Sequence, residues 1–241
     1  MRETPDVETS SAAYARRFAG AAGQYLLDAQ ASAIARSIAD LAPGMALDVG
    51  GGHGQVLAPL RHLGWRVTVH GSEPVCGKNL RELHRETDVE FVSSDIFALP
   101  FPDRSFNLVT AVRLISHVEN WPRLLAEMCR IASCAVVIDY PSKFALNGLT
   151  PLMFGLKKSI EGNTRTYLSF TKRELAGAFE QNGFAVSRED KQLFLPMVLH
   201  RMSHGVAPVR AVERLCSAVG LTALAGSPVI LRADRCTSPG A

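Results

Sequence analysis

Short apolar segments alternate with amphipathic segments between residues 45 and 140, and this alternation limits the fold of the chain more than any other sequence feature. In the amphipathic segments, apolar residues recur three and four positions apart, which is the spacing of a helix with one buried face. Strands separated by helices are typical of a parallel sheet that is covered on both faces. We therefore expect a doubly wound, Rossmann-like α/β fold with a mostly parallel seven-stranded sheet and helices on both faces. The expected strands are 45–49, 66–70, 89–93, 108–112, 135–140, 184–195 and 228–233.

The segments outside this alternation are expected to be largely helical. Residues 12–41 are rich in Ala and carry a helical apolar stripe, with a break expected at the glycines of 20–23. Two later inserts, at about 141–169 and 196–225, mix apolar with basic residues, as the wall of a substrate site would. We therefore expect an N-terminal helical cap at 1–44 and a main domain at 45–241, in which the two inserts form a helical lid.

Some helix ends are marked by single residues. Pro122 suits the first turn of a helix that begins at Trp121. Thr171 followed by Glu174 is a capping-box pattern, and Gly183 is typical of a helix end. Residues 1–11 are polar and are expected to be loose.

Composition and charge exclude several classes of protein. Hydrophobic residues make up 47% of the chain and charged residues 20%, the proportions of a globular protein. The net charge of +3 is spread along the chain, unlike the basic clusters of nucleic-acid-binding domains. The longest apolar stretches fall far short of the roughly 20 residues that a membrane span needs. The polar start and the five scattered cysteines predict a cytoplasmic protein without a secretory signal.

A glycine-rich turn follows the first expected strand. Gly50, Gly52 and Gly54 let the backbone turn tightly and approach a ligand closely. The spacing differs from the dinucleotide fingerprint, and no Gly-Lys-Ser/Thr of a P-loop follows. Asp48 stands just before the glycines, and its carboxylate suits a ligand with a cationic or amine group. The turn therefore predicts a ligand other than a pyrophosphate, although such turns also occur for structural reasons.

Two further acids follow the second and third expected strands, where ligands of open α/β sheets bind. Glu73 can accept hydrogen bonds from both hydroxyls of a ribose. Asp95 can accept one from an adenine amino group, with Ile96 against the ring. Each acid alone fits a solvated loop position. Three acids at consecutive strand ends together predict a nucleoside-containing ligand.

These segments resemble the class I S-adenosylmethionine-dependent methyltransferases, particularly the small-molecule group typified by the quinone methylases. The resemblance covers about residues 45 to 140, and its most specific part is the string Leu-Pro-Phe-Pro-Asp-Arg-Ser-Phe at 99–106. It implies S-adenosylmethionine as the cofactor. The implied contacts are Asp48 with Gly50, Gly52 and Gly54 for the methionine part, Glu73 for the ribose, Asp95 with Ile96 for the adenine, and the backbone near Val112 for the methionine amine.

The chain departs from the family pattern at two places. Ala132-Ser133-Cys134 stands where relatives usually carry Pro-Gly-Gly, and Ser116 stands where Glu is frequent. Neither position is an implied cofactor contact, so the departures argue against a named subfamily rather than against cofactor binding.

The resemblance implies an enzyme that methylates a small or lipid-like molecule, with O- or C-methylation favoured. His117 is the preferred candidate for a general base, and the alternative is a capping or packing histidine before the helix that begins at Trp121. His200 and His204 are four residues apart but have no third ligand in a zinc pattern, so no metal site is predicted. The alternative function is an inactive methyltransferase-like module that keeps the cofactor or a relative. No nucleic-acid partner is expected, and a homodimer is left open.

Overall fold

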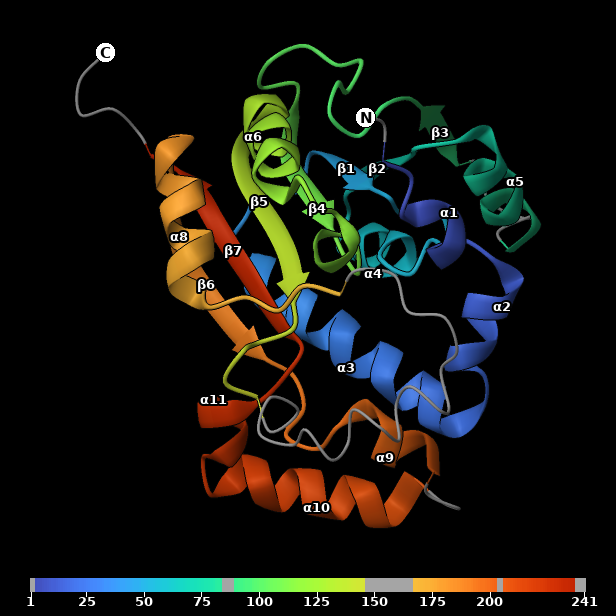
Figure 1. Ribbon diagram of the computed structural model, residues 1–241, viewed down its shortest axis with the longest axis vertical. Helices are drawn as coiled ribbons and strands as arrows, with labels where there is room; N and C mark the ends of the chain where they lie inside the picture. The colour runs from blue at the N-terminus through green and yellow to red at the C-terminus, as the bar shows by residue number, and fades with distance from the viewer. Residues whose placement is uncertain (1–2, 84–88, 146–166, 203–205, 237–241) are drawn as a thin grey trace.

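The computed structural model describes residues 3–83, 89–145, 167–202 and 206–236. In this part of the chain, seven strands form one sheet in the order β3-β2-β1-β4-β5-β7-β6 (Figure 1). Strands β1 to β5 pair in parallel, and β7 lies antiparallel between β5 and β6. This arrangement confirms the expected mostly parallel sheet. The strands are β1 (Met45–Val49), β2 (Arg66–Gly71), β3 (Glu90–Ser93), β4 (Phe106–Ala111), β5 (Ala132–Tyr140), β6 (Phe184–Lys191) and β7 (Val229–Arg235).

Helices cover both faces of the sheet, and each face has its own apolar core. One core joins strand residues to α6 and α8, and the other joins them to α3, α4 and α5. The N-terminal helices are α1 (Asp6–Thr9), α2 (Ala12–Ala15), the 3-10 helix η1 (Arg16–Phe18) and α3 (Gly20–Ile38). The remaining helices are α4 (Leu57–His62), α5 (Pro74–Leu83), η2 (Ile115–His117), α6 (Trp121–Ile131), α8 (Lys172–Gln181), α9 (Met197–Met202), α10 (Val206–Ala218) and α11 (Leu221–Ala225).

Side-chain alternation along β1 determines which residue reaches which face. Leu47 and Val49 enter the core beneath α6, whereas Ala46 enters the core beneath α3 and α4. Because successive side chains of a strand point to opposite faces, Asp48 lies on the same side as Ala46. The strand thus delivers one carboxylate, rather than another apolar group, to the α3 side at its carboxyl end.

The expected break in the N-terminal helices is confirmed. Gly20 has a φ of +73° and begins α3, and a Cβ at Gly23 would overlap the backbone of Phe18. The chain therefore turns sharply between η1 and α3. The second half of α3 then packs against the sheet through Ala33, Ile34 and Ile38.

The expectation that residues 1–11 are loose is wrong for the part from Asp6 onward. Residues 6–9 form α1, and the Asp6 side chain is fully buried. Its carboxylate accepts hydrogen bonds from the Ser72 backbone N–H, at 2.7 Å, and from the Ser72 hydroxyl. We call residues 6–18, which comprise α1, α2 and η1, the N-terminal strap.

Of the two expected lid inserts, the second folds as α9, α10 and α11, which lie beyond the tip of β5 in Figure 1. Most of the first, residues 146–166, lies outside the described residues. No helix within the described ranges is long and apolar enough to cross a membrane.

Candidate functional site

A small pocket lies where β1 and β4 end. Its free space is about 20 Å³, room for little more than a water molecule. The glycine turn, the chain after β4 and the N-terminal strap all contribute to its wall. The lining residues are Thr9, Tyr14, Asp48, Gly50, Gly51, His53, Gln55, Val56, Val112 and Arg113.

Asp48 is the acidic group of this pocket, and its side chain is 1% exposed. Its Oδ1 accepts a hydrogen bond from the Thr110 hydroxyl at 2.9 Å. Its Oδ2 is buried and has no hydrogen-bond partner among the described residues. Burial raises the pKa of Asp48 to about 7, and the Thr110 hydrogen bond only partly opposes this rise. The carboxylate is thus an unfilled acceptor in a site that favours its neutral form.

The glycine turn brings the backbone close to this carboxylate. Gly50 and Gly54 have φ values of +72° and +63°, which residues with a Cβ rarely adopt. A Cβ at Gly51 would overlap Asp48 Oδ2, so only glycine fits beside that oxygen. The N–H groups of Gly50 and Gly51 both donate to the His70 carbonyl, at 2.9 and 3.2 Å, which fixes the turn to β2. The turn is therefore a rigid wall with one open acceptor.

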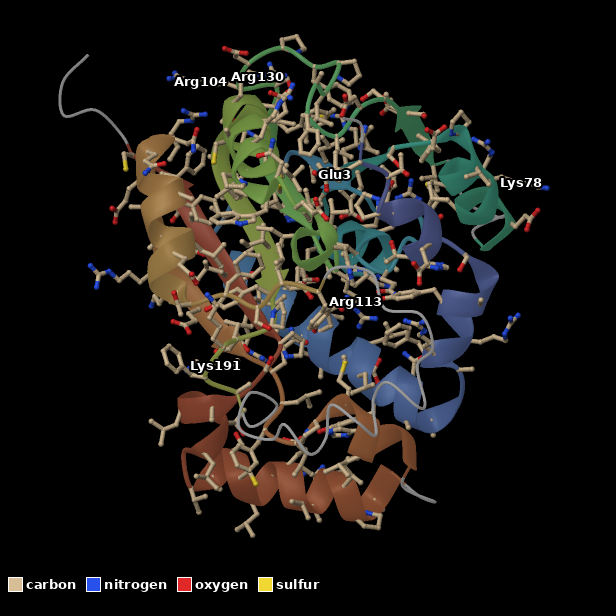
Figure 2. All side chains as sticks on the ribbon, viewed as in Figure 1. Glu3, Lys78, Arg104, Arg113, Arg130 and Lys191 are labelled. Atoms are coloured by element: carbon tan, nitrogen blue, oxygen red, sulfur yellow. The ribbon has the colours of Figure 1, made fainter. Side chains whose placement is uncertain are left out.

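Arg113 supplies a basic group to the same pocket. Its backbone N–H donates to Asp139 Oδ1 at 2.5 Å, and its Nε donates to Gln30 Oε1 at 2.9 Å. Its guanidinium carbon lies 3.9 Å from the centre of the Phe18 ring. In Figure 2, Lys78 extends from the edge of the molecule, whereas Arg113 lies inside its outline beside α3. The pocket therefore combines an acid and a base whose side chains hydrogen-bond to Thr110 and Gln30 rather than to each other.

The other predicted cofactor residues lie at neighbouring strand ends, outside the pocket lining. Glu73 follows β2 and is half-buried, next to the Ser72 that binds Asp6. Asp95 follows β3, and its Oδ1 accepts from the Phe97 N–H at 2.9 Å. Ile96 is fully buried in the core beneath α6.

The structure therefore brings only part of the predicted set into one pocket. Asp48, Gly50 and Val112 line it, and Gly52 and Gly54 belong to the same turn. Glu73 and Asp95 stand at the ends of the next two strands along the sheet.

His117, the predicted base, belongs to η2 in the chain that follows β4. It is half-buried, and its ring centre lies 5.6 Å from that of Tyr167. The adjacent Ser116 carbonyl accepts a hydrogen bond from the Leu168 N–H at 2.8 Å, which joins η2 to the chain before α8. His117 does not line the small pocket.

The two histidines that are four residues apart, His200 and His204, do not form a metal site within the described residues. His200 is 2% exposed, and its Nε2 lies 3.0 Å from Glu213 Oε1. His204 lies outside the described residues. Across the described ranges, no group of three or more His, Cys, Asp or Glu side chains could hold a metal ion.

Sequence reasoning missed Arg113 and the strap residues Asp6 and Thr9. Arg113 lies two residues after the end of β4, but its role depends on contacts with Gln30 and Phe18, which are distant in the sequence. Nothing local marked Asp6, because its burial depends on Ser72, which is 66 positions away in the sequence. Tyr14 of α2 is a further strap residue at this site. It lines the pocket and stacks on His53 with ring centres 5.8 Å apart.

Comparisons with known proteins agree with this architecture. Residues 47–133 match a family described as a methyltransferase domain. No curated protein matches the chain. Among solved structures, the magnesium protoporphyrin IX methyltransferase from Synechocystis PCC 6803 with bound S-adenosylhomocysteine is 14% identical, with a TM-score of 0.61; the match covers 92% of this chain and 93% of that one.

Two further solved structures show the same likeness. A SAM-dependent methyltransferase from Thermotoga maritima, titled a possible histamine N-methyltransferase, is 16% identical with a TM-score of 0.61, over 88% of this chain and 89% of that one. The [4+2]-cyclase SpnF is 19% identical with a TM-score of 0.59, over 88% and 81%. At such identities these likenesses concern the fold. Residues 47–133 thus match the methyltransferase-domain family, and the chain has the fold of the class I S-adenosylmethionine-dependent methyltransferases.

Proposed function

We propose that this chain is an S-adenosylmethionine-dependent methyltransferase that methylates a small or lipid-like molecule, at an oxygen or a carbon atom. S-Adenosylmethionine is the cofactor of the family, and structures of the Synechocystis enzyme contain it or its product. The observation that carries the proposal is Asp48 Oδ2, a buried acceptor without a partner among the described residues, held open by Gly51 at a strand end. A ligand with a cationic amino group would fill that acceptor and favour the charged carboxylate.

The proposed cofactor residues lie at the carboxyl ends of adjacent strands. We assign the methionine part to Asp48 with Gly50, Gly52 and Gly54, and its amine also to the backbone near Val112. We assign the ribose to Glu73 and the adenine to Asp95 with Ile96. Support comes from their placement, since they follow β1, β2, β3 and β4, which are adjacent in the sheet.

When bound, the cofactor supplies a methyl group that its sulfonium already activates. The protein must align the acceptor atom and exclude water, which is catalysis by proximity and orientation. We assign to a ring nitrogen of His117 the removal of a proton from a hydroxyl or an acidic carbon of the substrate. Its place on η2, directly after β4, supports this role.

The inserts after β5 are the proposed substrate wall and lid. The second carries large exposed apolar side chains, including Leu215, Val219 and Leu224, which are 64%, 61% and 73% exposed. Apolar surface of this kind favours an apolar or lipid-like substrate. We also retain a cytoplasmic location without a nucleic-acid partner, with a homodimer left open.

Calorimetry with S-adenosylhomocysteine tests the cofactor assignment. The wild type is expected to bind it, and Glu73→Ala to weaken binding by about 1.5–3 kcal/mol, because hydrogen bonds to a charged group are lost. This loss is roughly 10- to 150-fold in affinity. Glu180→Ala, on the exposed face of α8, is the matched control and should bind like the wild type. Unchanged affinity in a folded Glu73→Ala variant would refute the ribose assignment.

A turnover screen with methyl acceptors tests the enzyme itself. His117→Ala should lower kcat by about 10²–10⁴ and leave S-adenosylhomocysteine affinity nearly unchanged, since the imidazole acts on the acceptor's proton. His62→Ala, exposed at the end of α4, is the control. Full turnover by His117→Ala would exclude it as the base. Binding without turnover of any acceptor would favour the alternative of an inactive binding module.

A further inference from the structure

The proposed function leaves one buried charge of the pocket unused, the guanidinium of Arg113. Its Nε donates to Gln30 Oε1, but its Nη1 is buried without a hydrogen-bond partner in the part of the chain that the structure describes. A guanidinium carries five N–H donors, and leaving one buried and unpaired is costly. The link to Gln30 explains how Arg113 joins α3, but it does not explain the unfilled donor.

The backbone at Arg113 is also held in an unusual conformation. Its φ of +60° lies in the left-handed region, which residues other than glycine rarely occupy. Asp139, 5% exposed, accepts the Arg113 N–H and so fixes this conformation. Such strain persists where the surroundings impose it, and it concentrates at functional sites. The strained turn directs the side chain toward Gln30 and the Phe18 ring at the pocket wall.

The pocket thus has two opposite charges, each with one unfilled position. Asp48 Oδ2 is an acceptor without a donor, and Arg113 Nη1 is a donor without an acceptor, within the described residues. The hydrogen bonds of Asp48 and Arg113 do not join the two side chains to each other. An α-amino acid presents the complementary pair, an ammonium and a carboxylate on one carbon atom.

We infer that Arg113 binds the carboxylate of the amino-acid part of the cofactor, while Asp48 faces its ammonium group. This inference rests on the proposed function and adds a binding residue to it. A guanidinium suits the role because its planar fork matches the two oxygens of a carboxylate. The Phe18 ring, 3.9 Å below the guanidinium, holds the plane of that fork.

Two ligands separate this contact from the rest of the site. S-Adenosylhomocysteine carries the amino-acid part, and 5′-methylthioadenosine has the same nucleoside without it. Arg113→Gln should bind S-adenosylhomocysteine about 10- to 150-fold more weakly and 5′-methylthioadenosine within about twofold of the wild type, by calorimetry. Arg113→Lys, which keeps the charge without the fork, should fall between Gln and wild type, and it replaces the Gln variant if that variant does not fold. Arg66→Gln, exposed at the start of β2, is the control.

Each other result overturns the inference in a recognisable way. Equal losses for both ligands would mean that Arg113 supports the pocket in general, and no loss for either would mean that it contacts neither. Unchanged affinity for S-adenosylhomocysteine with a raised KM for the methyl acceptor would assign the anion to the substrate. If the wild type binds neither ligand, the proposed function itself fails. This outcome is distinct from a failure of the inference, which would change only the results for the Arg113 variants.

Discussion

At the scale of single residues, Asp48 links the chemistry of the pocket to the stability of the fold. An unfolded Asp titrates near pH 3.9, whereas burial raises the pKa of Asp48 to about 7 in the folded protein. Between these values the folded state holds a proton that the unfolded state has released. The free energy of unfolding therefore falls as the pH rises through this window, by a few kcal/mol in order of magnitude.

Asp48→Asn should remove this pH dependence, because an amide does not ionise. We expect the melting temperature of the variant, relative to the wild type, to increase from pH 4 to pH 8. Differential scanning calorimetry across that range measures it. Asp28→Asn, an exposed acid on α3, is the control for removing a carboxylate. Parallel curves for wild type and Asp48→Asn would show that the carboxylate is already charged in the folded protein.

Asp48 and Arg113 show what can be predicted from sequence at this scale. Asp48 could be predicted, because an acid before a glycine turn at a strand end is a local pattern. Arg113 could not, because its role depends on its positive φ and on contacts with Phe18 and Gln30. These contacts join Arg113 to residues that lie 83 and 95 positions away in the chain, so no local pattern reveals them.

At the scale of elements, several boundaries could be predicted from the local sequence. β1 and the start of α8 occur where expected, and α8 begins with the complete Thr171–Glu174 capping box. Apolar runs and caps act within a few residues, which is why they can be read locally.

Where an observed strand boundary differs from the expected one, contacts with residues distant in the sequence are the cause. The last expected strand residues before α9 are not in β6, because the N–H groups of Phe194 and Leu195 donate to Glu213 of α10. β5 starts at Ala132 rather than Ala135, because α6 ends directly before it and Phe106 pairs with Ala132. At these positions the backbone groups form hydrogen bonds with residues that are distant in the sequence, so the local pattern does not predict the boundary.

At the scale of the whole molecule, Arg232 joins the last strand of the sheet to the end of an N-terminal helix. Its side chain on β7 is 3% exposed. It donates to the Ser37 carbonyl at 2.8 Å, to Asp40, and to both carboxylate oxygens of Asp234, at 2.6 and 3.0 Å. The end of α3 is thereby fixed to the last strand of the sheet.

Arg232→Met should lower the free energy of unfolding by about 1.5–3 kcal/mol, because the carbonyl of the buried Ser37 loses a charged donor and the carboxylates of Asp40 and Asp234 lose a buried partner. Urea titration measures this change. Arg188→Met is the matched control, since Arg188 reaches the same Asp40 from an exposed position on β6 at 3.1 Å and should cost 1 kcal/mol or less, roughly. Similar losses for the two variants would show that Arg232 acts as a surface ion pair.

The N-terminal strap has a consequence for the speed of ligand entry. Thr9 and Tyr14 help to reduce the pocket to about 20 Å³, which is far too small for an amino acid. Entry therefore has to wait for the strap to detach, and the Asp6–Ser72 hydrogen bonds must break before Ser10 can leave Gly52. A ligand can arrive no faster than this opening, so the observed association rate reaches a ceiling as its concentration increases. The same opening limits the dissociation rate, so the strap sets the rate at which a used ligand is replaced by a new one.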